Sequence, residues 1–471
     1  MPLAGSFHVK HYRYVLSLVI LAFLVSSCTV SRSPVTGRKR AYAYTWEQER
    51  QLGAQADQQI QAVYGIYPDP ELTAYVDQVG QDVLETSHLR RPDTPQEFRE
   101  TPFVFRVLDS PVVNAFALPG GYVYVTRGLL VHMNNEAQLA VVLGHEIGHV
   151  AARHASQRAF VQQLGQLVLL GGAIAGQEIL NLPAQDILNL GGAAAQLMFL
   201  RYSRADEEES DKLGVEYASM ARYEAGEGSY FFESLKRISE KEGQAIPTWM
   251  SSHPDPGDRE DRILSLAARY EQQYPMDRLE QRDLYNALEG VIMGENPRNG
   301  FVENGVFYHP ELRFQFPVPR SFRVANQASQ VVMVEEQGRA AAVFTIAGQS
   351  SPQTAAQEFA SQQGLQVVNS GSASSNGLPA YYVVADAQTE QGQVLRILAY
   401  YVQHADNVYG FTAYSLREQF SAFEQEFLRS MRGFAGVTDQ RILNVEPVRL
   451  RIESARRSGS FQSFVPSPLP G

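Results

Sequence analysis

The chain of 471 residues is too long for one ordinary hydrophobic core, so two or three domains are expected. Hydrophobic residues make up 44% and charged residues 19% of the chain, a balance that fits a soluble globular protein. The formal net charge of −11 argues against nucleic acid as a partner, because phosphates attract Lys and Arg.

The N-terminal segment has the features of a secretory signal. Lys10, His11 and Arg13 flank or precede the apolar run YVLSLVILAFLVSSC, which is shorter than the roughly 20 residues that cross a bilayer. Its ending, VSSC, resembles a bacterial lipobox, in which the cysteine at the cleavage site carries lipid. We therefore expect residues 1–27 to be a lipoprotein signal peptide and Cys28 to be lipidated. The alternative is an unmodified core cysteine behind a membrane anchor.

The residues around Cys28 also predict location. Thr29, in place of aspartate, follows Cys28, and by resemblance to Gram-negative lipoproteins this favours the outer membrane over the inner one. We expect a lipid-anchored protein of the bacterial cell envelope that faces the periplasm, with residues 28–45 as a polar, basic tether. No other cysteine is present, so disulfides contribute nothing to the fold.

Helical and strand patterns follow this tether. The stretches beginning at Thr45 and Leu72 have the amphipathic spacing of helices. Phe103–Val131 is β-branched and aromatic and is broken by DSP and PGG, so it predicts strands joined by turns. A long helix is expected from about Asn135. Val161–Leu200 is apolar but contains polar interruptions, which favours packed helices or a hairpin over the neighbouring site rather than a membrane span.

The second half of the chain changes in character at a linker. Another helix begins near Arg204 and runs past Ala218, whereas Gly, Asn and Pro dominate residues 293–305. From residue 306 to about 434, strand patterns alternate with two helical segments, which predicts an α+β module. We find no catalytic motif in that module and expect a poorly ordered tail after it.

The predicted central helix carries the sequence VVLGHEIGHVAARHA. His145 and His149 are four residues apart, so they share one face and can present both imidazoles to one ion. Glu146 lies beside them, where a carboxylate can take a proton from metal-bound water. Gly144 and Gly148 each cost about 1 kcal/mol relative to alanine inside a helix, so they suggest close approach by another backbone. The alternative is a helix with structural histidines.

A catalytic zinc site needs a third protein ligand and one position left open for water. The stretch RYSRADEEESDKLGVEYASMA supplies candidates, although an acidic, solvated helix start is the simpler interpretation. Glu207 shares its helix face with Asp211 and two small residues, whereas Glu208 lies on a face expected to be exposed. We therefore predict Glu207 as the ligand and Asp211 as a carboxylate that orients the site. His154, five residues past His149, points off the ligand face and is expected to be structural.

Together with NAFALPGGYVYVTRGLL and SSHPDPGDR, these motifs resemble the HtpX- and BepA-like zinc metallopeptidases, gluzincins related to the CAAX prenyl proteases. The resemblance covers about residues 46–274. It implies a zinc metalloendopeptidase that binds one zinc ion per chain through His145, His149 and Glu207. In the implied mechanism, Glu146 accepts a proton from zinc-bound water, and the resulting hydroxide attacks a peptide carbonyl.

Two further residues follow from the same resemblance. Asn114 matches a family residue on the substrate-binding strand beside the metal, and the exposed edge of that strand is expected to align an extended substrate. His253 matches a histidine near the zinc that contacts the substrate or caps the metal at rest. Without the motif, a histidine in a polar loop would be assigned to the surface.

The predicted fold class is α+β. A mainly helical gluzincin-type metallopeptidase domain with a small active-site sheet is expected over residues 46–290, a smaller α+β domain over 301–436, and a tail over 437–471. The expected function is cleavage of unfolded or misfolded proteins in envelope quality control. The main alternative is a chaperone or binding lipoprotein whose zinc is structural or capped by His253. A third possibility is that the C-terminal domain binds an envelope-protein partner, with the peptidase as its effector.

Overall fold

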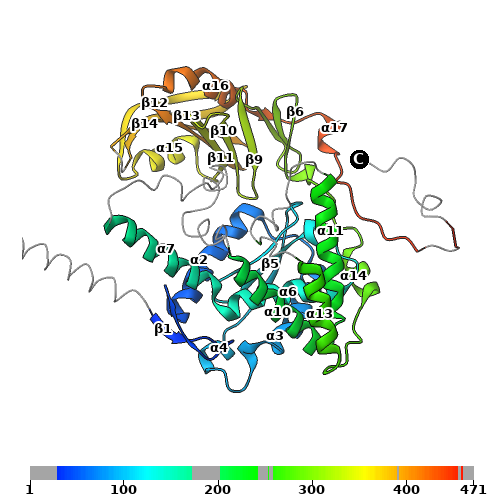
Figure 1. The fold of residues 1–471 in the computed structure, drawn as a ribbon. Coiled ribbons are helices and arrows are strands. Elements are labelled where there is room, and N and C mark those ends of the chain that lie inside the picture. The colour runs from blue at the N-terminus through cyan, green and yellow to red at the C-terminus, as the bar shows by residue number, and fades with distance from the viewer. Residues whose placement is uncertain are drawn as a thin grey trace, which may run out of the picture.

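The computed structural model describes residues 29–171, 202–241, 253, 258–389, 392–454 and 458–459. Figure 1 shows a mainly helical N-terminal domain below a sheet-rich C-terminal domain, which confirms the expected mixture of helix and sheet. Within these residues, every helix is too short or too polar to cross a bilayer. The expected signal peptide, Cys28 and most of the apolar stretch before Arg204 lie outside the described residues.

Helices of the N-terminal domain surround a three-stranded sheet of order β3-β5-β4, in which β3 and β5 are parallel and β4 is antiparallel to β5. The central helix begins where it was expected, and Asn135 caps it, because the Asn135 side chain accepts a hydrogen bond from the Gln138 backbone. The elements of this domain are β1 (Thr29–Arg32), β2 (Lys39–Tyr42), α2 (Trp46–Tyr64), α3 (Pro70–Glu85), a 3-10 turn (His88–Arg90), α4 (Gln96–Arg99), β3 (Val104–Leu108), β4 (Ala115–Leu118), β5 (Tyr122–Thr126), α5 (Arg127–Leu130), α6 (Glu136–Ala152), α7 (His154–Gly171), α10 (Arg204–Met220), a 3-10 turn (Ala225–Glu227), α11 (Gly228–Lys241), α13 (Arg259–Glu271) and α14 (Gln281–Leu288).

The core of this domain is built around α6, which is buried along its whole length. Apolar side chains from α3, the sheet and α11 belong to the same cluster, among them Val83, Val123 and Phe231, each 0% exposed. Burying such a side chain contributes about 1.5–3 kcal/mol. The position of α6 is therefore fixed from several sides.

The segment expected to be a tether is folded from residue 29 onwards. Strands β1 and β2 form an antiparallel hairpin, and Arg153 holds it to the domain. The Arg153 guanidinium donates to Ser31 Oγ at 2.8 Å, to the Tyr44 carbonyl at 2.8 Å and to Glu49 Oε1 at 2.6 Å. The structure differs from the expectation because two four-residue strands carry little periodicity, and the residue that secures them is distant in sequence.

The C-terminal domain consists of a seven-stranded antiparallel sheet of order β12-β13-β14-β15-β11-β10-β9 and a four-stranded sheet of order β16-β8-β7-β6. Helix α16 packs with one face of the larger sheet, where Tyr400 is buried, and α15 packs with the other, where Tyr401 is buried. The elements are a 3-10 turn (Pro297–Asn299), β6 (Phe301–Glu303), β7 (Val306–His309), β8 (Phe314–Pro317), β9 (Phe322–Asn326), β10 (Gln330–Glu335), β11 (Ala340–Gly348), α15 (Pro352–Ala360), β12 (Leu365–Ser375), β13 (Leu378–Gln388), β14 (Val394–His404), β15 (Asn407–Leu416), α16 (Phe420–Arg432), β16 (Ala435–Gly436) and α17 (Gln440–Leu443).

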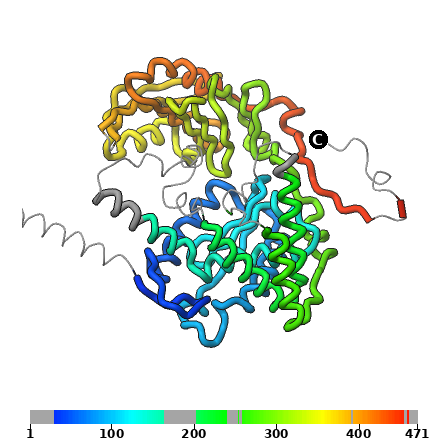
Figure 2. Tube along the Cα trace, in the orientation of Figure 1, coloured from blue at the N-terminus to red at the C-terminus, as the bar shows by residue number. Residues whose placement is uncertain are grey.

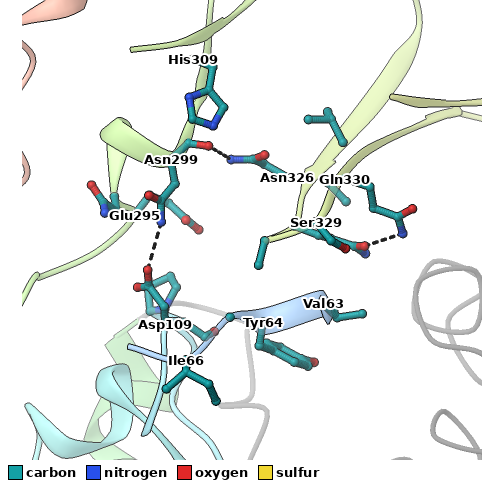
Figure 3. Close-up of a pocket in the computed structure, with 18 of the residues that line it drawn as sticks. Val63, Tyr64, Ile66, Asp109, Glu295, Asn299, His309, Asn326, Ser329 and Gln330 are labelled. Carbon is teal, nitrogen blue, oxygen red and sulfur yellow. Dashed lines mark hydrogen bonds between the residues drawn. The ribbon is translucent and has the colours of Figure 1, made fainter. Parts of the chain in front are cut away.

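A cleft of about 560 Å³ lies between the two domains (Figure 3). Asn299 Nδ2 donates to Asp109 Oδ2 across it at 3.0 Å, and the Ala328 amide donates to the Val63 carbonyl at 3.1 Å. Arg127, only 1% exposed, contributes a third connection, because it binds Asp109 and the linker carbonyls that follow α14. The domains are therefore joined by specific polar contacts as well as by the chain.

The C-terminal tail is ordered further than its sequence suggests. In Figure 2 the red segment descends from the C-terminal domain towards the helices of the N-terminal domain. The Met293 amide donates to the Val448 carbonyl, and the Leu450 amide donates to the Val291 carbonyl, each at 2.8 Å. The first part of the expected tail thus pairs with the interdomain linker, a long-range contact that local composition does not reveal.

Candidate metal centre

Helix α6 places three polar side chains in the middle of the N-terminal core. His145, Glu146 and His149 are 1%, 1% and 3% exposed. The Nε2 atoms of the two histidines lie 3.0 Å apart, because one helical turn separates them on the same face. Two imidazoles at this separation can contact the same ion.

Helix α10 brings Glu207 to the histidines. Glu207 Oε2 lies 3.5 Å from His145 Nε2, and Oε1 lies 3.4 Å from His149 Nε2. Glu207 is 0% exposed, whereas Glu208 is exposed to solvent. Glu207 is therefore in the interior and Glu208 at the surface, as helical periodicity predicted from the sequence.

The approach of α10 to α6 depends on glycines. A Cβ atom on Gly144 would lie 2.9 Å from the Gly214 carbonyl oxygen, and one on Gly214 would lie 2.7 Å from the His145 amide nitrogen. A Cβ atom on Gly148 would lie 3.3 Å from the Ser210 Cα. The two helices consequently contact each other backbone to backbone, which is the close approach that the glycines of α6 suggested.

His253 completes the cluster from a separate segment. Its Nδ1 atom lies 3.1 Å from Glu207 Oε1 and 3.3 Å from His145 Nε2, and its side chain is buried. One ligand atom from each of His145, His149, Glu207 and His253 can be chosen so that all lie within 4.8 Å of one another. A histidine, histidine and carboxylate set is typical of catalytic zinc, and the four atoms converge closely enough to hold one ion.

A second layer of contacts orients His145. Its Nδ1 atom lies 3.0 Å from Asp211 Oδ1, as expected for a carboxylate behind a ligand. Arg259 donates to the same oxygen through Nε at 3.0 Å and Nη2 at 2.5 Å, and its guanidinium packs over the Phe232 ring. We did not predict a role for Arg259, although it ends the SSHPDPGDR motif that contains His253.

His154 and Tyr202 also contact the cluster. His154 Nδ1 lies 3.0 Å from His149 Nδ1, although helical geometry pointed it elsewhere. The difference arises because α6 ends at Ala152 and Arg153 is left-handed with φ of 59°, so His154 starts a new helix. Tyr202 stacks on the His149 ring with centroids 4.0 Å apart, and burial raises its pKa. Tyr202 follows the undescribed segment, and we found no sequence signal for it.

The protonation states of the cluster follow from burial and from its internal contacts. Burial lowers the pKa of His149 well below its ordinary value. Burial would also lower the pKa of His145, but hydrogen bonds to Asp211 and Glu207 raise it to about 9. Burial opposes ionisation of Glu207, yet the charge of His253 and hydrogen bonds from the histidines hold its pKa well below the usual range. An ionised Glu207 beside a neutral His149 provides two of the ligand states that a metal requires.

Glu146 Oε1 and Asn114 Oδ1 are two of the six buried side-chain oxygens that have no hydrogen-bond partner among the described residues. Glu146 Oε1 lies 3.5 Å from His253 Nε2. Asn114 is 5% exposed and immediately precedes β4, and its backbone exchanges hydrogen bonds with Thr126. Leaving such an oxygen unpaired costs about 1–3 kcal/mol, so both are better explained by a partner that binds during function.

Comparison with known proteins finds matches that are named as peptidases. Residues 70–267 match Peptidase family M48. "Metalloendopeptidase OMA1, mitochondrial" of Homo sapiens is 30% identical over 261 residues, which cover 50% of this chain and 46% of that protein. The "Putative beta-barrel assembly-enhancing protease" of Vibrio cholerae is 30% identical, covering 48% and 44%, and the "Beta-barrel assembly-enhancing protease" of Escherichia coli is 28% identical, covering 51% and 47%. The chain therefore spans about half the length of these relatives.

Proposed function

We propose that the chain is a zinc-dependent metalloendopeptidase, because residues 70–267 match Peptidase family M48. The observation that carries this proposal is the convergence of His145, His149 and Glu207 with Glu146 in the core. A structural metal would not require a buried carboxylate oxygen left without a partner beside the ligands.

In this proposal His145, His149 and Glu207 hold one zinc ion, which when bound lowers the pKa of a water molecule and polarises a peptide carbonyl. Glu146 accepts the proton of the attacking water and donates it to the leaving amine. Asp211 fixes the ring of His145 through its Nδ1 atom. The core around α6 excludes bulk water from these groups.

The proposed substrates are unfolded or misfolded proteins. Strand β4 is at the edge of its sheet, so its outer peptide groups can pair with an extended chain. Asn114 lies at the start of β4, where its unpaired Oδ1 can accept a hydrogen bond from the backbone of that chain. Zinc-dependent cleavage of casein, abolished by a chelator, tests the activity, and trapping with a Glu146→Gln variant would identify natural substrates.

We place this activity in the bacterial envelope, in protein quality control. The lipobox-like sequence ending at Cys28 supports a lipid anchor, and Thr29 after it favours the outer membrane, facing the periplasm. Relatives from Vibrio cholerae and Escherichia coli are named as beta-barrel assembly-enhancing proteases. The C-terminal domain, which is tied to the peptidase domain at Arg127 and Asn299, is a candidate to bind an envelope-protein partner.

Replacing Cys28 with alanine tests the anchor. We expect the Cys28→Ala protein to leave the membrane fraction, because the acyl chains that hold it there can no longer be attached. The measurement is immunoblotting of membrane and soluble fractions, with a Ser27→Ala variant as the control. Retention of Cys28→Ala in the membrane would show that the apolar N-terminal run is itself the anchor.

Replacing His253 with alanine tests whether this residue restrains the enzyme. Because His253 Nδ1 lies among the ligand atoms, we propose that it takes the position that water needs, so His253→Ala should raise basal cleavage of casein. If His253 instead stabilises the transition state, the rate should fall by about a hundredfold. Zinc content is measured in parallel. A zinc-loaded His253→Ala protein that remains inactive would favour the chaperone or binding lipoprotein.

A further inference from the structure

The β1–β2 hairpin has two different faces, because residues opposite each other in an antiparallel pair point to the same side. Its inner face is attached to the N-terminal domain. Tyr42 is 0% exposed beneath the Arg153 guanidinium, which lies 3.8 Å from its ring, and Ser31 Oγ accepts from Arg153. Arg40 donates to Gln157 on α7 at 3.3 Å. These contacts of Tyr42, Ser31 and Arg40 hold the hairpin in place.

The outer face concentrates positive charge. Arg32 and Lys39 are directly opposite each other and exposed, and Val30 on the same face is 66% exposed. Residues 29–42 contain no aspartate or glutamate, although the whole chain has a net charge of −11. Like charges directly opposite in a sheet are destabilising. The arrangement therefore has a cost in the isolated protein that a negatively charged surface would remove.

We propose that this outer face, formed by Val30, Arg32 and Lys39, docks on the anionic lipid headgroups of a membrane surface. Each cation near such a surface contributes about 1 kcal/mol, and the exposed valine adds apolar contact with the interfacial region. The hairpin also begins one residue after Cys28, so the proposed lipid anchor would deliver it to the bilayer.

Docking of the hairpin would set the orientation of the whole molecule. Arg153 joins the inner face of the hairpin directly to the end of α6, the helix that carries the metal ligands. In Figure 1, β1 lies at the opposite end of the molecule from the C-terminal sheets. The metal centre would thus be held at a fixed distance above the lipid, with the C-terminal domain directed away from it.

The test uses the full chain with a fluorophore on a Thr36→Cys reporter in the exposed hairpin turn. The protein is reconstituted with vesicles of phosphatidylcholine, with or without phosphatidylglycerol, and the chain without the reporter is labelled in parallel to subtract any dye on Cys28. We expect the emission to shift to the blue with phosphatidylglycerol and to return as salt is added, because salt screens these charges.

Substitutions then assign the effect to the outer face. Arg32→Gln with Lys39→Gln should weaken docking by about thirtyfold, which corresponds to two cations of about 1 kcal/mol each. Arg320→Gln with Arg451→Gln is the matched control, since both side chains are about 80% exposed and lie outside the hairpin. The hairpin variant should keep its melting temperature, because it removes a repulsive pair, so loss of docking cannot be ascribed to unfolding.

Three outcomes would overturn the proposal. One is the same emission shift on phosphatidylcholine alone, and another is an equal loss in the control variant. The third is a shift in native membranes that is absent from vesicles containing phosphatidylglycerol, which would indicate an acidic protein as the partner. None of these measurements depends on peptidase activity. A negative result would therefore contradict membrane docking of the hairpin without contradicting the proposed peptidase function.

Discussion

Glu146→Gln should retain its zinc and lose casein cleavage by about a hundred- to ten-thousand-fold, the range that a general base contributes. Glutamine keeps the size and hydrogen-bonding ability of the side chain but cannot accept the proton of the attacking water. Because the contacts among His145, His149 and Glu207 do not involve Glu146, the substitution leaves these three residues in place. The measurement is the initial rate of cleavage beside metal analysis of the same preparation.

A matched control for Glu146→Gln is Glu208→Gln, which changes the charge equally at an exposed position of α10. The control should cleave casein at the rate of the unaltered protein. Comparable rates in Glu146→Gln would exclude Glu146 as the base, whereas loss of zinc in this variant would give it a role in metal binding that we do not propose.

Glu207→Ala should lose zinc. The carboxylate lies 3.4 and 3.5 Å from the two histidine Nε2 atoms, and its ionised form supplies the negative charge of the ligand set. Loss of an outer partner weakens metal binding about 10- to 100-fold, so loss of a direct ligand should have at least the larger of these effects. Metal analysis should fall from about one zinc per chain to a small fraction, and cleavage should fall with it.

Glu207→Gln and Glu208→Ala make the test of the ligand specific. Glutamine preserves the packing beneath Arg259, so zinc loss without a change in melting temperature would separate ligation from stability. Glu208→Ala should keep its zinc, because its side chain is about half exposed on the other side of α10. Retention of zinc in Glu207→Ala, or its loss in Glu208→Ala, would show that the wrong glutamate was chosen.

Short-range features of the sequence were sufficient to predict the two helices that carry the metal centre, α6 and α10. Asn135 and Ser203 cap α6 and α10 through side-chain hydrogen bonds to the backbone, so both helices begin where capping chemistry predicts. Helical spacing then correctly places Glu207 in the interior and Glu208 at the surface. These features depend on residues within a few turns of one another, which is the range over which helical periodicity holds.

Features that depend on a break in a helix or on distant segments could not be obtained in this way. The left-handed conformation of Arg153 ends α6 and redirects His154 towards His149. No pattern in HVAARHA predicts that the helix ends there. Similarly, the contacts of Arg259 and His253 with the centre join segments that are remote in sequence. The motif SSHPDPGDR indicated that this segment contributes to the site, but it did not indicate which of its atoms contact Glu207 and Asp211.

The pairing of the tail with the linker has a consequence for modularity. The chain leaves the peptidase domain near Ile292 and returns near Arg449, and these two residues form a β-bridge. The chain therefore enters and leaves the C-terminal domain at neighbouring points, as it does in a domain that is inserted into a surface loop. A short loop could therefore replace the C-terminal domain without moving the two chain segments that it joins.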